Sequence, residues 1–401
     1  MTSVPFLRSV CLVTLGLASC SSGSGATGVQ GVDSGNVDAP DPSDTGATDG
    51  ASEVGGDVPL PIVSATKIAL PGTPLGMAYN TGTKKAYFAC ATTDASGVIR
   101  NAGIAIVDDK TGTVIRTIAV SNTVKAMGAN GTTKKVYAAD GNTVDIIDST
   151  TDAVTSVKLP KGATSGFEFI MSFAVDESHN RVYVLGAPGG STTAIVHVLD
   201  GASDAFTAAF TVPIAPGGMN SIAVDPATQK IFVLGNDAAF NANIVTINGT
   251  NGTVAPAIVT AYGLANTDGI VSVGDNNAAV TLLRSASLPS IVRFIDPVDA
   301  VLPAGFVPGG IATFGVGLII TGYDSTTGDS HLLLVDRGGV VSTMSDAATK
   351  DEFLRHKLVA GAIIAGDLAP SSSTFYVELY PDPVTGKPLG EAAVLRVVLT
   401  K

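Results

Sequence analysis

The sequence carries few charged residues for its length. Only 14% of its 401 residues are Asp, Glu, Lys or Arg, and it contains no tryptophan. About a quarter charged is usual for globular proteins, so the low fraction argues against a coiled coil or a mostly disordered chain. The chain is 45% hydrophobic and has 46 glycines, which favours many short strands joined by tight turns. A net charge of −12 disfavours nucleic acid and anionic membrane surfaces as partners.

Cysteine is also scarce, and we expect no internal disulfide in the mature protein. The three cysteines are Cys11 and Cys20 near the N-terminus and Cys90 within the body of the chain. Cys90 lies in the apolar run Ala86–Ala91. We therefore expect a buried free thiol that packs as a small hydrophobic residue rather than a nucleophile.

Residues 1–19 have the features of a signal peptide. Arg8 is their only charged residue, and the apolar run Val10–Ala18 is too short to span a bilayer as a helix. The run ends in Leu17–Cys20, which resembles a bacterial lipobox. The resemblance implies a thioether-linked diacylglycerol on Cys20, and two or more acyl chains give stable anchoring. The alternative is an ordinary secretory signal with a chance cysteine.

The next segment, residues 20–60, is predicted to be a lipidated cysteine followed by an acidic tether. Residues 21–60 contain seven acids but no lysine, arginine or aromatic residue, and they are rich in Gly, Ser and Asp. Such a segment buries too little apolar surface to offset its chain entropy, so we expect disorder. Ser21, rather than an aspartate, follows the cysteine, which favours the outer membrane. We expect a lipid-anchored protein of the bacterial cell envelope, on the periplasmic or the surface side of that membrane.

Internal repeats dominate residues 61–401. Four segments share an apolar strand, a polar turn and an aromatic-led second strand that begins at Lys85, Lys135, Arg181 or Lys230. A third strand then ends in a carboxylate or an amide before a turn, at positions 108, 148, 200, 248, 296 and 336. A period near 48 residues with four short strands per unit is typical of β-propeller blades.

A divergent seventh unit completes the series at the C-terminus. It comprises Ala360–Ala365, Thr374–Tyr380 and Ala392–Thr400 and lacks a fourth strand, which Ile62–Leu70 can supply. We therefore predict an all-β fold, a seven-bladed propeller of four-stranded blades closed by an N-terminal strand that pairs into the last blade. Closure removes the exposed sheet edges of an open array.

These units resemble YVTN-type β-propeller repeats, which occur in surface-layer-like and secreted envelope proteins. Tyr183–Gly186 and Phe232–Gly235 are similar to the Tyr-Val half of that pattern, and Ile147–Thr151 to its Ile-Asp-x-x-Thr half. The resemblance spans about residues 75–325. WD-type repeats fit poorly because tryptophan is absent.

The repeated polar residues are predicted to be structural. An aspartate that precedes a tight turn accepts backbone N–H bonds there, and one per blade cannot converge on a single substrate. These aspartates are Asp108, Asp148, Asp200, Asp296 and Asp336. The basic residues at the first turn of each unit should share one face of the ring and form a partial ring of positive charge. These residues are either solvated strand ends or a docking site for an anionic polymer or for the acidic tether. These bases are Lys84, Lys85, Lys134, Lys135, Arg181 and Lys230.

The sequence offers no recognisable catalytic or cofactor motif. Its four histidines lie in different units without metal-ligand spacing, and no phosphate loop, nucleotide-binding glycine pattern or Gly-x-Ser-x-Gly elbow occurs. We therefore predict no catalytic residue, metal or cofactor.

Binding is expected on the face opposite the basic turns, where loops between second and third strands and between blades vary in length. The candidate contacts are Arg100, Phe167, Phe169, Asn236, Phe240 and Arg355. Arg355 belongs to a charge-rich insertion, Asp346–Lys357, that is predicted to be helical.

The leading interpretation is a monomeric, lipid-anchored binding or scaffold module with an envelope or extracellular protein or polysaccharide as ligand. One alternative is a lactonase-like hydrolase of a lactone or sugar-like substrate, which requires carboxylates that converge near the ring axis. Another alternative is a structural surface-layer component.

Overall fold

The computed structural model describes the chain from residue 62 to residue 400 with several gaps. The described ranges are 62–160, 168–189, 191–214, 221–236, 241–263, 269–274, 277–282, 290–295, 299–314, 317–326, 330–343, 358–369, 372–381 and 393–400. All of them belong to one compact unit, Asp57–Lys401. The predicted signal peptide, Cys20, the tether and the insertion Asp346–Lys357 lie outside the described residues. No helix within these ranges is long and apolar enough to cross a membrane.

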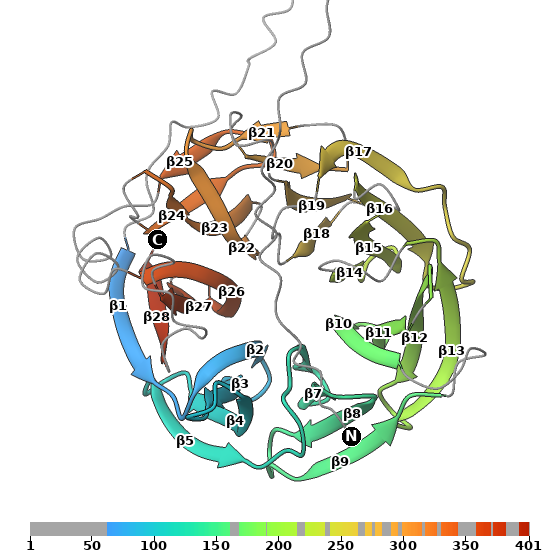
Figure 1. Ribbon diagram of the computed structural model, residues 1–401, viewed down its shortest axis with the longest axis horizontal. Helices are drawn as coiled ribbons and strands as arrows, with labels where there is room; N and C mark the ends of the chain where they lie inside the picture. The colour runs from blue at the N-terminus through green and yellow to red at the C-terminus, as the bar shows by residue number, and fades with distance from the viewer. Residues whose placement is uncertain are drawn as a thin grey trace, which may run out of the picture. The chain divides into compact units, whose positions relative to one another are not determined.

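The strands form seven four-stranded antiparallel sheets, arranged as the blades of a ring (Figure 1). Blade 1 contains β2 (Thr73–Asn80), β3 (Lys85–Thr93), β4 (Ile99–Asp108) and β5 (Thr113–Ile118). Blade 2 contains β6 (Met127–Asn130), β7 (Lys135–Asp140), β8 (Thr143–Asp148) and β9 (Val154–Lys158). Blade 3 contains β10 (Glu168–Asp176), β11 (Arg181–Pro188), β12 (Ala194–Asp200) and β13 (Ala205–Val212). Blade 4 contains β14 (Ser221–Asp225), β15 (Lys230–Asn236), β16 (Asn241–Asn248) and β17 (Ile258–Gly263).

The later blades follow the same order, and in each blade the first strand lies nearest the ring axis (Figure 1). Blade 5 contains β18 (Ile270–Gly274), β19 (Asn277–Leu282), β20 (Ile291–Phe294) and β21 (Asp299–Val301). Blade 6 contains β22 (Phe306–Phe314), β23 (Gly317–Asp324), β24 (Ser330–Val335) and β25 (Val341–Thr343). Blade 7 contains β26 (Leu358–Ala369), β27 (Ser372–Pro381), β28 (Ala393–Thr400) and β1 (Ile62–Ala69).

The predicted closure of the ring is confirmed. The N-terminal strand β1 pairs antiparallel with β28, in a register that runs from Ile62 opposite Leu399 to Ala69 opposite Ala393. The first strands of neighbouring blades contact each other around the ring, including β2 with β26 across the closure. The first and last described strands therefore belong to one sheet.

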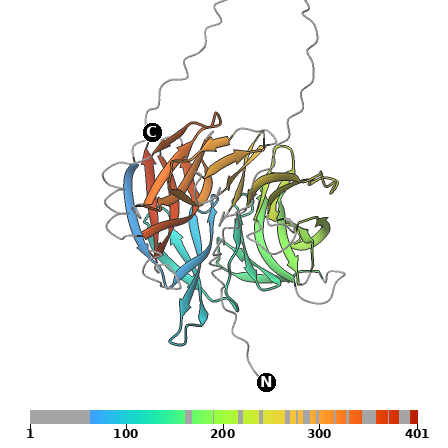
Figure 2. The same ribbon diagram turned by 45° about the horizontal axis from the view of Figure 1, so that its top comes forward.

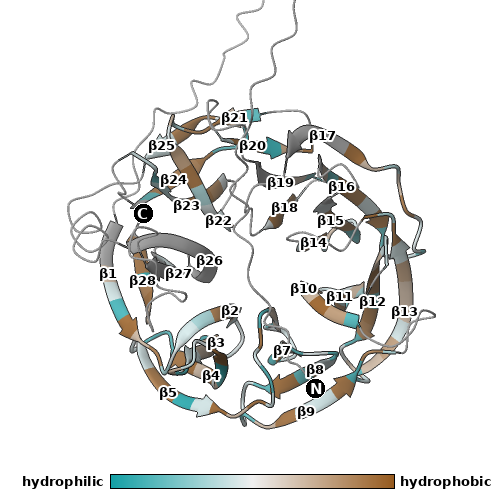
Figure 3. Ribbon diagram, in the orientation of Figure 1, coloured by the Kyte–Doolittle hydropathy of each residue, from teal (hydrophilic) through white to brown (hydrophobic). Residues whose placement is uncertain are grey.

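Within the described residues, the core consists of seven apolar clusters, each shared by two neighbouring blades. Between blades 1 and 2, for example, Tyr87 and Ile104 pack with Val136 and Ile147. A blade that lies between two others buries both of its faces, which explains why the middle strands are apolar runs rather than alternating patterns. Figure 3 shows hydrophobic segments in strands around the ring, such as β8, β10 and β23. The outermost strand β5 is largely exposed.

The turns between first and second strands repeat in conformation as well as in sequence. Lys84, Lys134, Asn180 and Gln229 end four equivalent turns with left-handed φ values of 54°, 57°, 50° and 54°. Each is followed at once by the second strand. The polar turn expected from the sequence is thus one backbone geometry used repeatedly.

Candidate functional site

The antiparallel order of each blade gives the ring two faces. The turns between first and second strands and between third and fourth strands share one face, the turn face. The turns between second and third strands and the connections between blades share the other, the loop face. The β3–β4 hairpin projects beyond one face of the ring (Figure 2).

On the turn face, the repeated carboxylates cap turns as predicted. Asp108 accepts a hydrogen bond from the Thr111 backbone N–H at 2.8 Å, and Asp148 accepts one from Thr150 at 2.8 Å. Asp200 and Asp336 accept equivalent bonds, while Asn248 does the same in blade 4. Asp296 lies outside the described residues. The backbone N–H groups hold the pKa values of Asp108, Asp148 and Asp200 below the ordinary aspartate value.

Three of the bases expected in a ring of positive charge contact the next blade instead. Lys85 lies 3.1 Å from the Asp152 carboxylate, and Lys135 lies 2.7 Å from that of Asp204. Arg181 donates to the Gly249 carbonyl at 3.3 Å. Each base starts a second strand and binds the turn between the third and fourth strands of its neighbour. These contacts fix the blades to each other and reduce the charge available to an external polyanion.

Where blade 7 meets blade 1, several hydrogen bonds converge on one residue of the turn between third and fourth strands. Asp109, buried in the β4–β5 turn of blade 1, accepts hydrogen bonds from Tyr376 at 2.6 Å and from Tyr79 at 2.9 Å. Arg396 of β28 donates to the Asp109 carboxylate at 3.2 Å and to its carbonyl at 2.7 Å. Burial, together with the bond to Asp109, raises the pKa of Tyr376. Sequence reasoning missed this cluster.

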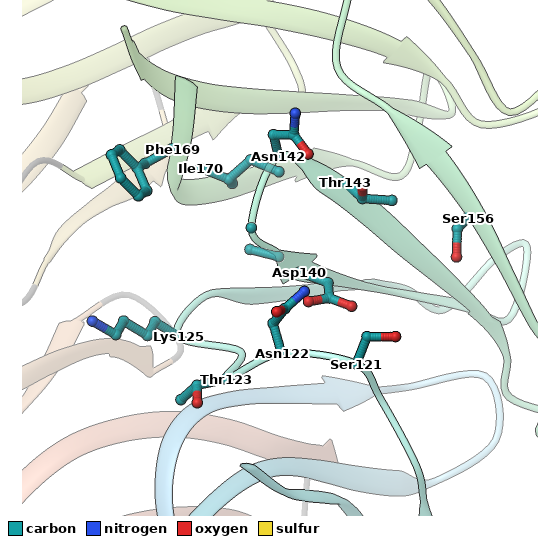
Figure 4. Close-up of a pocket in the computed structure, with 12 residues that line it drawn as sticks. Ser121, Asn122, Thr123, Lys125, Asp140, Asn142, Thr143, Ser156, Phe169 and Ile170 are labelled. Carbon is teal, nitrogen blue, oxygen red and sulfur yellow. The ribbon is translucent and has the colours of Figure 1, made fainter. Parts of the chain in front are cut away.

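On the loop face, a cavity of about 650 Å³ lies over blade 2. It is formed by the connection from blade 1, the β7–β8 turn, one residue of β9 and the start of β10. Its lining residues are Ser121, Asn122, Thr123, Lys125, Ala139, Asp140, Gly141, Asn142, Thr143, Ser156, Phe169 and Ile170. Figure 4 shows Lys125 and Phe169 towards one side of this pocket, Ser156 on the other, and Asp140 and Asn122 between them. We call it the loop-face pocket.

Asp140, which lines the loop-face pocket, has a second carboxyl group as its neighbour, that of Asp145, which does not line the pocket. The register places Asp145 opposite Ala138 on one side and Ser156 on the other, so Asp140, two residues from Ala138, projects from the same side of the blade. Asp145 accepts a hydrogen bond from the Ser156 hydroxyl at 2.6 Å. Burial raises the pKa of Asp145, and the Asp140 carboxyl raises it further against the effect of Ser156.

Asp140 itself has an unsatisfied oxygen. The residue is only 7% exposed, and its Oδ1 has no hydrogen-bond partner among the described residues. Buried carboxylate oxygens are normally paired, because the unpaired state costs desolvation energy that nothing repays. Asp140 lines the loop-face pocket as a residue, so a donor group of a ligand bound there is one candidate partner for this oxygen.

A second buried acid, Glu168, lies beside the pocket, and its Oε2 atom also has no hydrogen-bond partner among the described residues. Glu168, the neighbour of the lining residue Phe169, lies 2.7 Å from Nε2 of His197, which is 2% exposed. Gly186 leaves the space for this pair, since a Cβ there would come within 1.9 Å of the Glu168 Oε1 atom. The pair stabilises the start of β10 and so positions Phe169.

The candidate contacts from the sequence have different outcomes. Phe169 lines the loop-face pocket and is 52% exposed. Arg100 does not line it, and its guanidinium bonds Asp94 at 2.9 Å within the β3–β4 hairpin. Asn236 ends β15, opposite Ala242 of β16. Phe167, Phe240 and Arg355 lie outside the described residues.

Sequence reasoning overlooked Asp140, Asn122 and Asn142. A signal for Asp140 was nevertheless present in the repeats. The third residue after the aromatic of each second strand is Cys90 in blade 1, Gly186 in blade 3 and Gly235 in blade 4, but a carboxylate in blade 2. A charged side chain at a position that is otherwise small or apolar departs from the structural pattern.

The other potentially reactive side chains of the described residues do not form a cluster. Cys90 is a free, buried thiol, as predicted, and burial raises its pKa to about 11. No group of three or more His, Cys, Asp or Glu side chains within the described ranges is placed to hold a metal ion.

Comparisons with known proteins support the fold alone. No protein-family model and no curated protein sequence matches the chain. Hydrazine synthase from Kuenenia stuttgartiensis is similar in structure, with a TM-score of 0.55 and 14% identity over 83% of this chain and 96% of that one. A streptogramin B lyase has a TM-score of 0.52 and 12% identity over 84% of this chain and 97% of that one. At these identities the likeness shows a β-propeller and carries no activity across.

Proposed function

We propose that the protein is a lipid-anchored binding module of the bacterial cell envelope that captures its ligand through the loop face. The observation that carries this proposal is the loop-face pocket with the unpaired Asp140 oxygen. On the turn face, by contrast, the repeated polar groups already bind turns and neighbouring blades. In such a ring the turn face is occupied by contacts between blades, whereas the loop face offers a pocket with polar residues to a ligand.

The anchor and the repeat family are parts of the same proposal. The lipobox-like segment Leu17–Cys20 supports attachment to the outer membrane through acyl chains on Cys20, and the acidic tether would hold the ring away from the lipid. The YVTN-like repeats support an envelope location. The ligand would be an envelope or extracellular protein or polysaccharide, bound by a monomer.

The proposal is tested with the purified full chain and the insoluble envelope fraction of the source bacterium. Sedimentation measures how much protein the fraction retains. We expect retention to fall at least tenfold in a double variant, Asn122→Ala with Asp140→Asn, because both side chains line the pocket. Lys134→Gly, on an exposed turn-face residue with φ 57°, is the control and should be retained as the native chain is. Equal loss in both variants, or no retention of the native chain, contradicts the proposal.

A second candidate, a hydrolase of a lactone or sugar-like substrate, is favoured by one observation. Asp140 lines the pocket and interacts with the carboxyl group of Asp145 behind it, and the raised pKa of Asp145 suits a proton donor. Incubation of the full chain with a panel of lactones and aryl glycosides tests this. Product release that is abolished in both Asp140→Asn and Asp145→Asn would establish the hydrolase, and absence of turnover would leave binding as the function.

A further inference from the structure

Half of the twelve residues that line the loop-face pocket carry side chains that both donate and accept hydrogen bonds. Hydroxyls come from Ser121, Thr123, Thr143 and Ser156, and amides from Asn122 and Asn142. Pockets for drug-like ligands are predominantly apolar with few polar groups, and a volume of about 650 Å³ lies within their usual size range. A polar lining of this kind in a pocket of this size matches a small ligand that itself carries several hydroxyl groups.

The carboxylate of Asp140, which lines the pocket and has an unpaired oxygen, favours a ligand that donates. Hydroxyl groups on adjacent carbons can each donate to a carboxylate, which gives charge-assisted hydrogen bonds of the stronger kind. Such bonds would satisfy the buried Oδ1 atom. An anionic ligand would instead meet this carboxylate without a donor.

The charge balance of the pocket favours a neutral ligand. Lys125 lines the same cavity as Asp140, so the two formal charges oppose each other. The neighbouring Asp145 is shifted towards its neutral form, which reduces the attraction for a cation. The absence of a three-ligand acidic or histidine group within the described ranges also disfavours a metal ion.

Phe169 adds a flat apolar surface at one side of the pocket (Figure 4). Its ring is half exposed although it stands beside the buried pair of Glu168 and His197, which holds its strand in place. The C–H face of a pyranose ring is apolar while its edge is polar, so it can cover an aromatic ring as its hydroxyls reach the polar lining.

We propose that the loop-face pocket binds one or two sugar units of a neutral polysaccharide. Asp140 accepts from adjacent hydroxyls, Asn122 and Asn142 bond the remaining hydroxyls, and Phe169 stacks on a sugar ring. This inference rests on the proposed function and specifies the ligand class of the same site.

The test is an array of neutral oligosaccharides probed with the full chain, followed by titration calorimetry with the best binder. The array includes maltotriose, mannotriose, galactotriose and tri-N-acetylchitotriose. We expect Asp140→Asn to weaken binding at least tenfold, because an amide cannot replace a charged acceptor for two hydroxyls. Phe169→Ala should weaken it about fivefold.

Two matched controls separate the pocket from general effects of charge or apolar area. Asp148→Asn keeps the turn acceptor, as Asn248 does in blade 4, and Ile115→Ala removes an apolar side chain that is 50% exposed on β5. Both should bind as the native chain does. Undiminished binding by Asp140→Asn and Phe169→Ala would overturn the site.

Failure of the ligand class can be told apart from failure of the proposed function. If no oligosaccharide binds while the envelope fraction still retains the chain in a pocket-dependent manner, the saccharide assignment is wrong and the binding module stands. If neither oligosaccharide nor envelope fraction binds, both proposals fall.

Discussion

The two faces of the ring use polar residues in opposite ways. On the turn face, carboxylates, amides and bases recur from blade to blade and satisfy one another across the blade boundaries. Asn80, for example, donates to the Asn130 carbonyl of the next blade at 3.1 Å, and the Asn130 amide donates to Asn180 at 3.0 Å in the blade after that. On the loop face, the polar residues of the pocket over blade 2 are not repeated, and the Oδ1 atom of Asp140 is among the buried oxygens without a partner in the described residues.

The difference teaches how to separate structural from functional polarity in a repeat protein. A polar residue that recurs with the period of the fold is explained when its partners recur as well. A polar residue that breaks the period and has an unsatisfied atom is not explained by stability, because its burial is unfavourable. By this criterion Asp140 belongs to function and Asp148 to structure.

The largest effect is expected where the turn-face contacts close the ring. Asp109→Ala would leave Arg396 and two tyrosine hydroxyls without their shared acceptor in a buried site. Breaking such a charged cluster should cost about 3 kcal/mol of unfolding free energy, measured by urea denaturation.

The neighbouring residue provides the control. Asp108→Asn keeps an oxygen acceptor on an exposed turn and should change the unfolding free energy by less than about 0.5 kcal/mol. A loss below about 1 kcal/mol in Asp109→Ala would mean that backbone pairing between β1 and β28, rather than this cluster, carries the closure.

Much of the fold, but little of the pocket, could be predicted from the sequence. The blade count and the pairing of Ile62–Ala69 into the last blade followed from the repeat period and the missing fourth strand. The inter-blade contact of Lys85 did not, since its partner Asp152 is distant in the chain and is reached only through the ring geometry. Phe169 was among the candidates because variable loops carry binding, whereas Asp140 occupies the end of a repeated strand.

An intermediate effect is expected at the position of blade 3 that corresponds to Asp140. Gly186→Ala would place a Cβ 1.9 Å from the Glu168 Oε1 atom, and Glu168 cannot move freely because it binds His197. Overpacking of this kind should cost about 2 kcal/mol. Thermal and urea unfolding measure the loss.

Gly97→Ala separates this steric cost from the conformational one. Gly97 has a φ of 78° and its added Cβ would meet nothing within 4 Å, so only the backbone preference for glycine is lost, about 1 kcal/mol. If Gly186→Ala and Gly97→Ala lose the same stability, the Glu168 side chain can move away from the added methyl group at little cost, and it does not hold the start of β10.

The smallest effect, and the sharpest contrast between the faces, lies in the pH dependence of stability. The folded-state pKa of Asp145 is raised above its ordinary value of 3.8, so its contribution to stability is fully present below that pH and is lost as the pH rises through the folded-state pKa. Asp145→Asn should therefore gain stability at pH 7, by less than about 1 kcal/mol, and show no gain below pH 3.8.

The contribution of Asp148 to stability depends on pH in the opposite sense, because backbone N–H groups lower its pKa. Its contribution is present above pH 3.8 and is lost as the pH falls through the folded-state pKa. Asp148→Asn should accordingly lose stability at pH 7 and none in acid. Urea denaturation between pH 3 and pH 7 measures both slopes, and slopes of the same sign would show that burial of carboxyl groups does not distinguish the two faces.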